Sequence, residues 1–166
     1  VRFIKKTESN MIQKVYLETT IPSFVTAWPS RDIVMAGKQE TSREWWKNRR
    51  ELFEVYVSPF VIEEAQRGDS EAAAKRIKLL DELPVLAVDD EVTRITEAIL
   101  HEGLIPKKAS TDASHIAVAT RHGMDFLLTW NCKHIANAQM LKYIERAVNS
   151  LDYELPVLCT PDELMG

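Results

Sequence analysis

The chain has 166 residues, of which 45% are hydrophobic, and its formal net charge at pH 7 is −4. This length and composition predict one globular domain with a core large enough to fold alone, and they exclude a disordered chain. The negative net charge argues against a protein that coats nucleic acid non-specifically through a broad basic surface.

No membrane span is expected, because the longest apolar runs, FLLTW and PVLAV, fall far short of the roughly 20 residues that cross a bilayer. The opening VRFIKKTESN lacks the apolar core and cleavage site of a secretory signal. Met11 opens the part that looks folded, so we expect a tail over 1–10 and a single domain over 11–166. Cys132 and Cys159 are too few and too scattered for a disulfide framework or a thiolate metal site, which favours a reducing cytoplasm.

Apolar strand-like runs alternate with helical patterns along the chain, which predicts an α/β fold with a parallel sheet covered by helices on both faces. The expected strands are, in chain order, KVYLE, EVYVS, PVLAV, FLLTW and PVLCT. Helices are expected from Pro22, over about 37–53, in FVIEEAQRG after Ser58-Pro59, in SEAAAKRIKLLDEL capped by Asp69 or Ser70, in DDEVTRITEAILHEG, from Asp112 to His122, and in AQMLKYIERAVNSL.

The segment SREWWKNRRELF places four basic residues around two tryptophans. One interpretation is a nucleic-acid contact that holds phosphates and stacks bases. The favoured interpretation is an amphipathic helix with a solvated basic face and a tryptophan packed on the core.

Polar side chains follow the expected strands where the strands end. Glu18 follows KVYL, Glu64 lies one to two turns into the helix after EVYVS, and Asn131 follows FLLTW. Asp112 lies in the first turn of a helix, where the helix dipole favours a carboxylate. Because the loops at the carboxyl ends of parallel strands gather at one edge, these groups are expected to converge there. Such carboxylates repel one another unless a hard cation such as Mg²⁺ or Mn²⁺ lies among them.

Each of these residues also has a purely structural interpretation. Glu18 is compatible with a solvated strand end, Asp112 with a helix start, and Asn131 with an ordinary loop. Glu63 and Glu64 cannot both face inward on one helix. His115 is interpreted as a packing or capping residue rather than a metal ligand.

Three motifs together resemble the PIN-domain family, and within it the VapC-like toxin ribonucleases of prokaryotic toxin-antitoxin pairs. The motifs are YLETTIPSF, SPFVIEEAQRGD and DASHIAVATRHGMDFLLTWNCKHIAN, which cover most of the chain from Val15 to Asn137. The resemblance implies a three-layer α/β/α sandwich with a central parallel sheet, an acidic metal site at one edge, and endoribonuclease activity.

The resemblance also implies roles for individual residues. The first three family acids fall on Glu18, Glu64 and Asp112, with Glu63 as a surface neighbour. The fourth position, which is usually acidic, falls on Asn131, with Thr129 two residues before it, and Thr20 matches a small hydroxyl residue that often follows the first acid. Glu18 and Asp112 are expected to bind the ion, Mg²⁺ or Mn²⁺, with help from Glu64. The RNA backbone is expected to contact three lysines, Lys107, Lys108 and Lys133.

Two departures from the family pattern predict weaker activity. Glu18 is one methylene longer than the Asp found in many members, so its side chain must fold back or the metal must lie farther from the strand. Asn131 offers a neutral oxygen, which binds a hard cation less tightly than a carboxylate.

The family resemblance implies an antitoxin partner and a homodimer, for which exposed Trp28, Trp45 or Trp46 would supply an apolar contact. Two alternatives stay open. The first is a PIN fold that has lost its chemistry and serves as an RNA-binding or protein-binding module. The second is a metal-dependent nuclease that acts on DNA or on a housekeeping RNA without an antitoxin.

Overall fold

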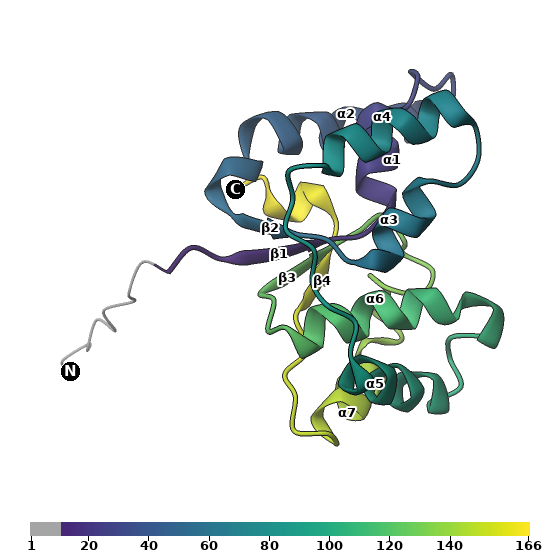
Figure 1. Ribbon diagram of the computed structural model, residues 1–166, viewed down its shortest axis with the longest axis vertical. Coiled ribbons are helices and arrows are strands. Elements are labelled where there is room, and N and C mark those ends of the chain that lie inside the picture. Colours follow the sequence, from purple (N-terminus) through teal and green to yellow (C-terminus); the bar gives the residue numbers. More distant parts are fainter. Residues whose placement is uncertain (1–10) are drawn as a thin grey trace.

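The computed structural model describes residues 11–166, in which a parallel sheet lies between two layers of helices (Figure 1). This architecture confirms the predicted α/β/α sandwich. The expected tail over 1–10 lies outside the described residues. Within them the sheet has four strands in the order β2-β1-β3-β4, with bounds β1 (Lys14–Leu17), β2 (Glu54–Tyr56), β3 (Phe126–Leu128) and β4 (Val157–Cys159).

The two central strands are the most deeply buried part of the sheet. Val15, Tyr16 and Leu17 of β1 and Leu127 and Leu128 of β3 have no exposed surface. Parallel strands covered on both faces have continuous apolar sequences, which explains why KVYL and FLL lack an alternating pattern. β1 pairs with both β2 and β3, so the chain segment that follows β1 emerges at the middle of the sheet edge.

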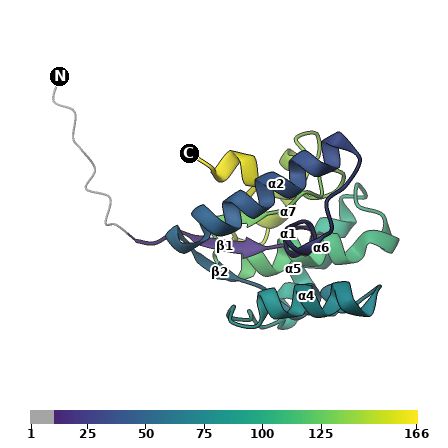
Figure 2. The ribbon, with the colours of Figure 1, turned by 90° about the horizontal axis from the view of Figure 1, so that it is seen from above.

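Helices from the first half of the chain cover one face of the sheet, and helices from the second half cover the other (Figures 1 and 2). The first group is α1 (Thr20–Thr26), α2 (Ile33–Asn48) and α4 (Ser70–Leu80). The second group is α5 (Asp90–His101), α6 (Ser110–Arg121) and α7 (Leu141–Asn149). The short helix α3 (Pro59–Ala65) contacts both α4 and α6. Three 3-10 turns, at Arg50–Leu52, Lys107–Ala109 and Pro161–Leu164, complete the described elements.

The expected strand PVLAV is not a strand in the structure. Only a single bridge joins Val57 to Val85 beyond the end of β2, supported by backbone bonds from Val57 to Pro84 and from Leu86 to Val57. Pro84 has no N–H for a ladder, and Val85 is 51% exposed at this outer edge. An apolar segment without a covering layer therefore passes the edge without extending the sheet.

The ends of two helices are fixed by local chemistry. The Asp69 side chain accepts a hydrogen bond from the N–H of Ala72 at 2.9 Å, so Asp69 rather than Ser70 caps α4. Gly123 has a φ of 62°, a left-handed conformation that ends α6 and turns the chain toward β3.

Trp45 of α2 is fully buried and stacks on Phe53, with the ring centroids 6.0 Å apart. The tryptophan packed on the core is thereby confirmed, and the expectation that Trp45 offers an exposed partner contact is wrong. The expected basic face is solvated only in part, because Lys47 is exposed whereas Arg43 donates to Val25 O and Ala27 O. Trp46 is partly buried and lies under the Arg50 guanidinium at 4.7 Å.

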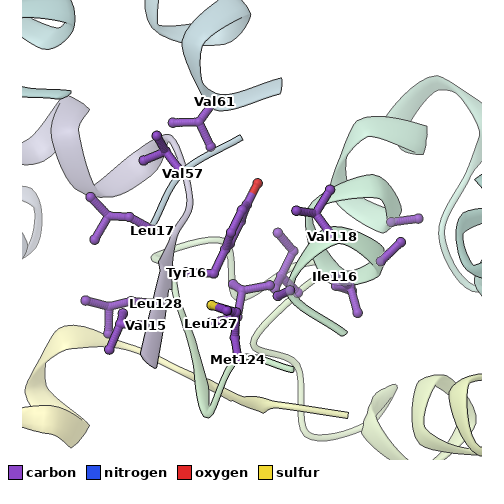
Figure 3. Close-up of a cluster of buried hydrophobic side chains, with 14 of the residues drawn as sticks. Val15, Tyr16, Leu17, Val57, Val61, Ile116, Val118, Met124, Leu127 and Leu128 are labelled. Atoms are coloured by element: carbon purple, nitrogen blue, oxygen red, sulfur yellow. The ribbon is translucent and has the colours of Figure 1, made fainter. Parts of the chain in front are cut away.

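Tyr16 brings a polar hydroxyl into the core. Figure 3 shows the Tyr16 side chain packed among Leu127, Ile116 and Val118, with its hydroxyl pointing away from Met124. A buried hydroxyl requires a hydrogen-bond partner. Its partners are Ser58 Oγ at 2.7 Å and His115 Nδ1 at 2.6 Å.

Among residues 11–166, every helix is too short or too polar to span a membrane.

Candidate metal centre

Glu18 leaves the end of β1 at the middle of the sheet edge and is only 5% exposed. Its Oε2 atom accepts three hydrogen bonds, from Thr20 Oγ1 at 2.5 Å, Thr20 N at 3.1 Å and Thr129 Oγ1 at 2.7 Å. The longer side chain is thus folded back onto the residue two positions later. Thr129 reaches it because β3 lies beside β1 in parallel register.

Glu64 projects from α3 toward Glu18. Its Oε2 atom accepts hydrogen bonds from Thr19 Oγ1 at 2.5 Å and from His115 Nε2 at 2.9 Å. Burial alone would raise the pKa of Glu64, but the hydrogen bonds from His115 and Thr19, with the charges of His115 and Arg67, outweigh it and leave the pKa lowered. Glu64 is therefore an ionised carboxylate at neutral pH. Glu63 is exposed and pairs with Arg67 at 2.7 Å, as expected for a surface neighbour.

His115 in α6 has no exposed surface, and its Nδ1 atom lies 2.6 Å from the Tyr16 hydroxyl. Ligand atoms of Glu18, Glu64 and His115 lie within 4.8 Å of one another, so His115 belongs to the candidate site, and its interpretation as a packing residue rather than a metal ligand stays a prediction. The sequence did carry a signal for this position. His115 follows Asp112 by three residues, which places both on one face of α6.

Asp112 lies in the first turn of α6 and does not belong to that three-residue group. Its Oδ2 atom lies 2.7 Å from Nδ1 of His134. Asn131 Oδ1 accepts a hydrogen bond from the His134 backbone N–H at 3.0 Å, so Asn131 caps the turn that carries His134. Sequence reasoning missed His134, although its position three residues after Asn131 is typical of such a turn.

The two threonines expected in the site act on Glu18 rather than facing outward. Thr20 Oγ1 donates to Glu18 and accepts from the Trp130 backbone N–H at 2.8 Å. Thr129 Oγ1 donates to Glu18 and accepts from the Asn131 backbone N–H at 2.8 Å. Both hydroxyls thereby fix the loop after β3 to the first acid.

The three lysines expected to contact RNA are exposed. Lys107 and Lys108 form the turn before α6, and Lys133 lies in the loop after β3. None of the ion pairs found in residues 11–166 includes them. The structure therefore leaves these charges available before α6 and after β3.

The sequence profile of the PIN domain matches residues 34–135, which is more than half of the chain. The chain belongs to the PIN domain family. The matched part contains Glu64, Asp112 and Asn131, whereas β1 and Glu18 precede it. No curated protein matches the chain.

PIN domains are in general metal-dependent nucleases, and the donor set of this PIN domain fits a divalent cation. Glu18, Glu64 and Asp112 each use one carboxylate oxygen, Oε2, Oε2 and Oδ2, for hydrogen bonds within the described residues. No such bond is made there by the second oxygen of any of the three acids. Hard cations prefer carboxylate oxygens of this kind, and hydrogen-bonded acids are held ready to bind them.

Proposed function

We propose that this PIN domain is an endoribonuclease that depends on Mg²⁺ or Mn²⁺ and that it is the toxin of a toxin-antitoxin pair. The observation that carries the proposal is the convergence of Glu18, Glu64 and His115 within 4.8 Å at the edge of a PIN-domain sheet. Two acids so close together are most stable with a cation between them. A cytoplasmic location fits an RNA substrate.

In this proposal Glu18, Glu64 and Asp112 supply the carboxylate oxygens that hold the ion. The bound ion would lower the pKa of a water molecule and offset charge on the scissile phosphate. His134 orients Asp112 through their 2.7 Å contact, and Thr129 holds Glu18. Asn131 would position outer-shell water.

RNA binding is assigned to the exposed charges beside the site. Lys107, Lys108 and Lys133 would hold the phosphates, which positions the chain without reading its sequence. Thr20 belongs to the support of Glu18 rather than to a direct RNA contact, since its hydroxyl is engaged on both sides.

A second function is favoured by the geometry around Asn131. Both Asn131 and Asp112 bond to His134, apart from the group that contains Glu18 and Glu64. In this second function the domain is an RNA-binding or protein-binding module with weakened chemistry, because Asn131 and Asp112 support His134.

Cleavage of total cellular RNA in Mg²⁺, Mn²⁺ or EDTA separates the two functions. The nuclease is expected to cut with either ion and to stop in EDTA. Glu64→Gln should lower the rate by roughly 10²- to 10³-fold, the usual effect of losing one group that stabilises charge in the transition state. Glu63→Gln is the matched control, because it removes the same charge from the adjacent exposed position. Equal rates for the two variants would exclude Glu64 from the site.

The toxin assignment has its own test, because a nuclease does not require an antitoxin. A small reading frame beside the gene should encode a protein that co-purifies with this chain and suppresses RNA cleavage. Cleavage that no neighbouring gene product suppresses would favour a nuclease of DNA or of housekeeping RNA.

A further inference from the structure

A continuous chain of buried polar groups leads from the core to the candidate metal centre. Ser58 Oγ lies 2.7 Å from the Tyr16 hydroxyl, which lies 2.6 Å from His115 Nδ1. His115 Nε2 lies 2.9 Å from Glu64 Oε2. Ser58, Tyr16 and His115 have no exposed surface, so this chain connects with solvent only through Glu64.

The direction of the hydrogen bonds follows from the chemistry of the two ends. The Oε2 atom of Glu64 already accepts from Thr19 Oγ1, and as a carboxylate oxygen it accepts from His115 as well, so His115 Nε2 carries a proton whether or not Nδ1 also does. A phenol hydroxyl keeps its proton at neutral pH, so the Tyr16 hydroxyl has one hydrogen to donate. With a neutral imidazole, Tyr16 donates to Nδ1 and accepts from Ser58.

These polar groups stand in otherwise apolar surroundings. Tyr16 occupies the middle of the central strand, between the buried apolar side chains of Val15 and Leu17. Burying a hydroxyl and an imidazole costs free energy unless every polar atom is paired. All of these pairings are made, and the last of them fixes Glu64.

We propose that Tyr16 and His115 are positioning residues that hold Glu64 by its Oε2 atom, leaving Oε1 for the cation, and that His115 is not itself a ligand. The inference rests on the proposed metal-dependent function. Fixing the tautomer and orientation of an imidazole through its second nitrogen is a common way for proteins to set the geometry of a metal centre.

The rival arrangement uses His115 as a ligand, as its closeness to Glu18 and Glu64 would permit. In that arrangement Nε2 loses its proton to bind the ion, and Nδ1–H donates to the Tyr16 hydroxyl. The two arrangements therefore differ in which ring nitrogen carries the hydrogen.

Nitrogen NMR of histidine-labelled full-length protein reports this directly. The His115 signals are assigned as those lost in His115→Gln. We expect Nε2 to be protonated in the ion-free protein and to remain so with Mg²⁺ or Zn²⁺, two diamagnetic ions of which Zn²⁺ readily accepts imidazole. Loss of the Nε2 proton on addition of either ion would overturn the proposal.

Calorimetric titration with Mn²⁺ alone tests the positioning role. Tyr16→Phe keeps the packed ring and removes only the hydroxyl, and it should weaken Mn²⁺ binding roughly ten- to a hundred-fold, as losses of outer-shell partners do. His115→Leu should do the same. His115→Gln should retain most of the affinity, because its amide N–H can still donate to Glu64.

Tyr56→Phe on the adjacent strand is the matched control. Its hydroxyl bonds to Glu54 at 3.0 Å on the surface, so its loss should leave Mn²⁺ affinity unchanged. A purely structural role for Tyr16 predicts a lower melting temperature for Tyr16→Phe with unaltered Mn²⁺ affinity. That result, or equal losses for His115→Gln and His115→Leu, would overturn the positioning role.

Wild-type protein that binds no Mn²⁺ would overturn the metal-dependent function and, with it, the positioning of Glu64 for an ion. If the wild-type protein binds Mn²⁺ and the Tyr16→Phe variant binds it with the same affinity, only the positioning role is overturned.

Discussion

At the scale of single residues, the acids of the site follow a common rule: each gives one oxygen to the protein. Glu18 shows its consequence most clearly. Three donors hold its Oε2 atom, so the extra methylene relative to Asp is absorbed by folding the side chain back. Asn131 is different, because its side-chain oxygen supports a turn through the His134 backbone N–H. A substitution is therefore needed to test whether Asn131 also contributes to metal binding.

Asn131→Asp is expected to strengthen Mn²⁺ binding. Aspartate has nearly the same shape, so it can keep the 3.0 Å bond to His134 while adding a charge beside Asp112. A charged oxygen binds a hard cation more tightly than a neutral one. Faster RNA cleavage should accompany it only if the added charge stabilises the transition state more than the ground state.

Calorimetry with Mn²⁺ measures this change, and Asn137→Asp is the control. Asn137 lies farther along the same loop, where its side chain bonds to Lys133 O and Gln139 N. The same charge placed there should do less. If the two variants act alike, Asn131 lies outside the metal centre.

At the scale of elements, α6 is the helix on which the site depends, and it is held in place mainly by α5 and the sheet. All of its residues from Ala113 to Thr120 are buried. Asp89 caps α5 through the N–H of Val92 at 3.1 Å and also binds Arg121 of α6 at 2.9 Å. This one carboxylate therefore links the start of one helix to the end of the other.

Asp89→Ala should lower the unfolding free energy at pH 7 more than Asp90→Ala, which removes the same charge from the next, exposed position. The hydrogen bond from Val92, followed by the bond and charge of Arg121, lowers the pKa of Asp89 below its usual 3.8. A lowered folded-state pKa contributes stability above the unfolded value, and that stability is lost as pH falls through the folded pKa. Urea unfolding should therefore show a smaller difference in unfolding free energy between Asp89→Ala and Asp90→Ala at pH 3 than at pH 7. A larger difference at pH 3 would contradict the role given to Asp89.

The central strand β3 sets the position of the loop that carries Thr129 and Asn131. Leu127 is fully buried between the helix layers, so Leu127→Ala should cost about 2–5 kcal/mol of unfolding free energy through lost transfer energy and a cavity. Val157→Ala in the edge strand β4 is the control, because Val157 is 57% exposed and should cost less than about 0.5 kcal/mol. Denaturant titration measures both, and equal costs would mean that β3 is not central.

At the scale of the whole molecule, the two helix layers bury the sheet but leave several large apolar side chains exposed. Trp28 is 79% exposed and Ile33, at the start of α2, is 86% exposed. Lys75 of α4 lies 4.8 Å over the Trp28 ring. With Trp45 buried, Trp28 is the strongest of the three tryptophans proposed for partner contact.

We expect the purified chain to form a homodimer with twice its 19.0 kDa mass in light scattering. Trp28→Ser should shift the mass toward the monomer, because an exposed aromatic side chain contributes most when an interface buries it. Val157→Ser, which also removes exposed apolar surface, should not. A monomer at every concentration of the wild-type chain would show the dimer prediction to be wrong.

The fold class and the position of Glu18 at the sheet edge were predictable from sequence because each depends on local order. Alternating apolar runs and helical patterns predict a parallel sheet, and parallel strands place Glu18 and the loop of Asn131 at one edge. Helical periodicity predicted one tryptophan packed on the core but did not identify it, and Trp45, which was expected to be exposed, is the buried one. The sequence did not predict that PVLAV fails to form a strand. An apolar run extends a sheet only where a neighbouring layer covers it, and Val85 lies at an uncovered edge.

The partners of the acids were decided only by the tertiary structure. His115 is 51 residues from Glu64 in the chain, Thr19 is 45 residues from it, and His134 is 22 residues from Asp112. No local spacing encodes such pairs, because they form when α3, α6 and the loop after β3 pack against one strand end. Sequence therefore determined which carboxylates reach the edge, whereas packing determined which oxygen of each is held and which is left for a ligand.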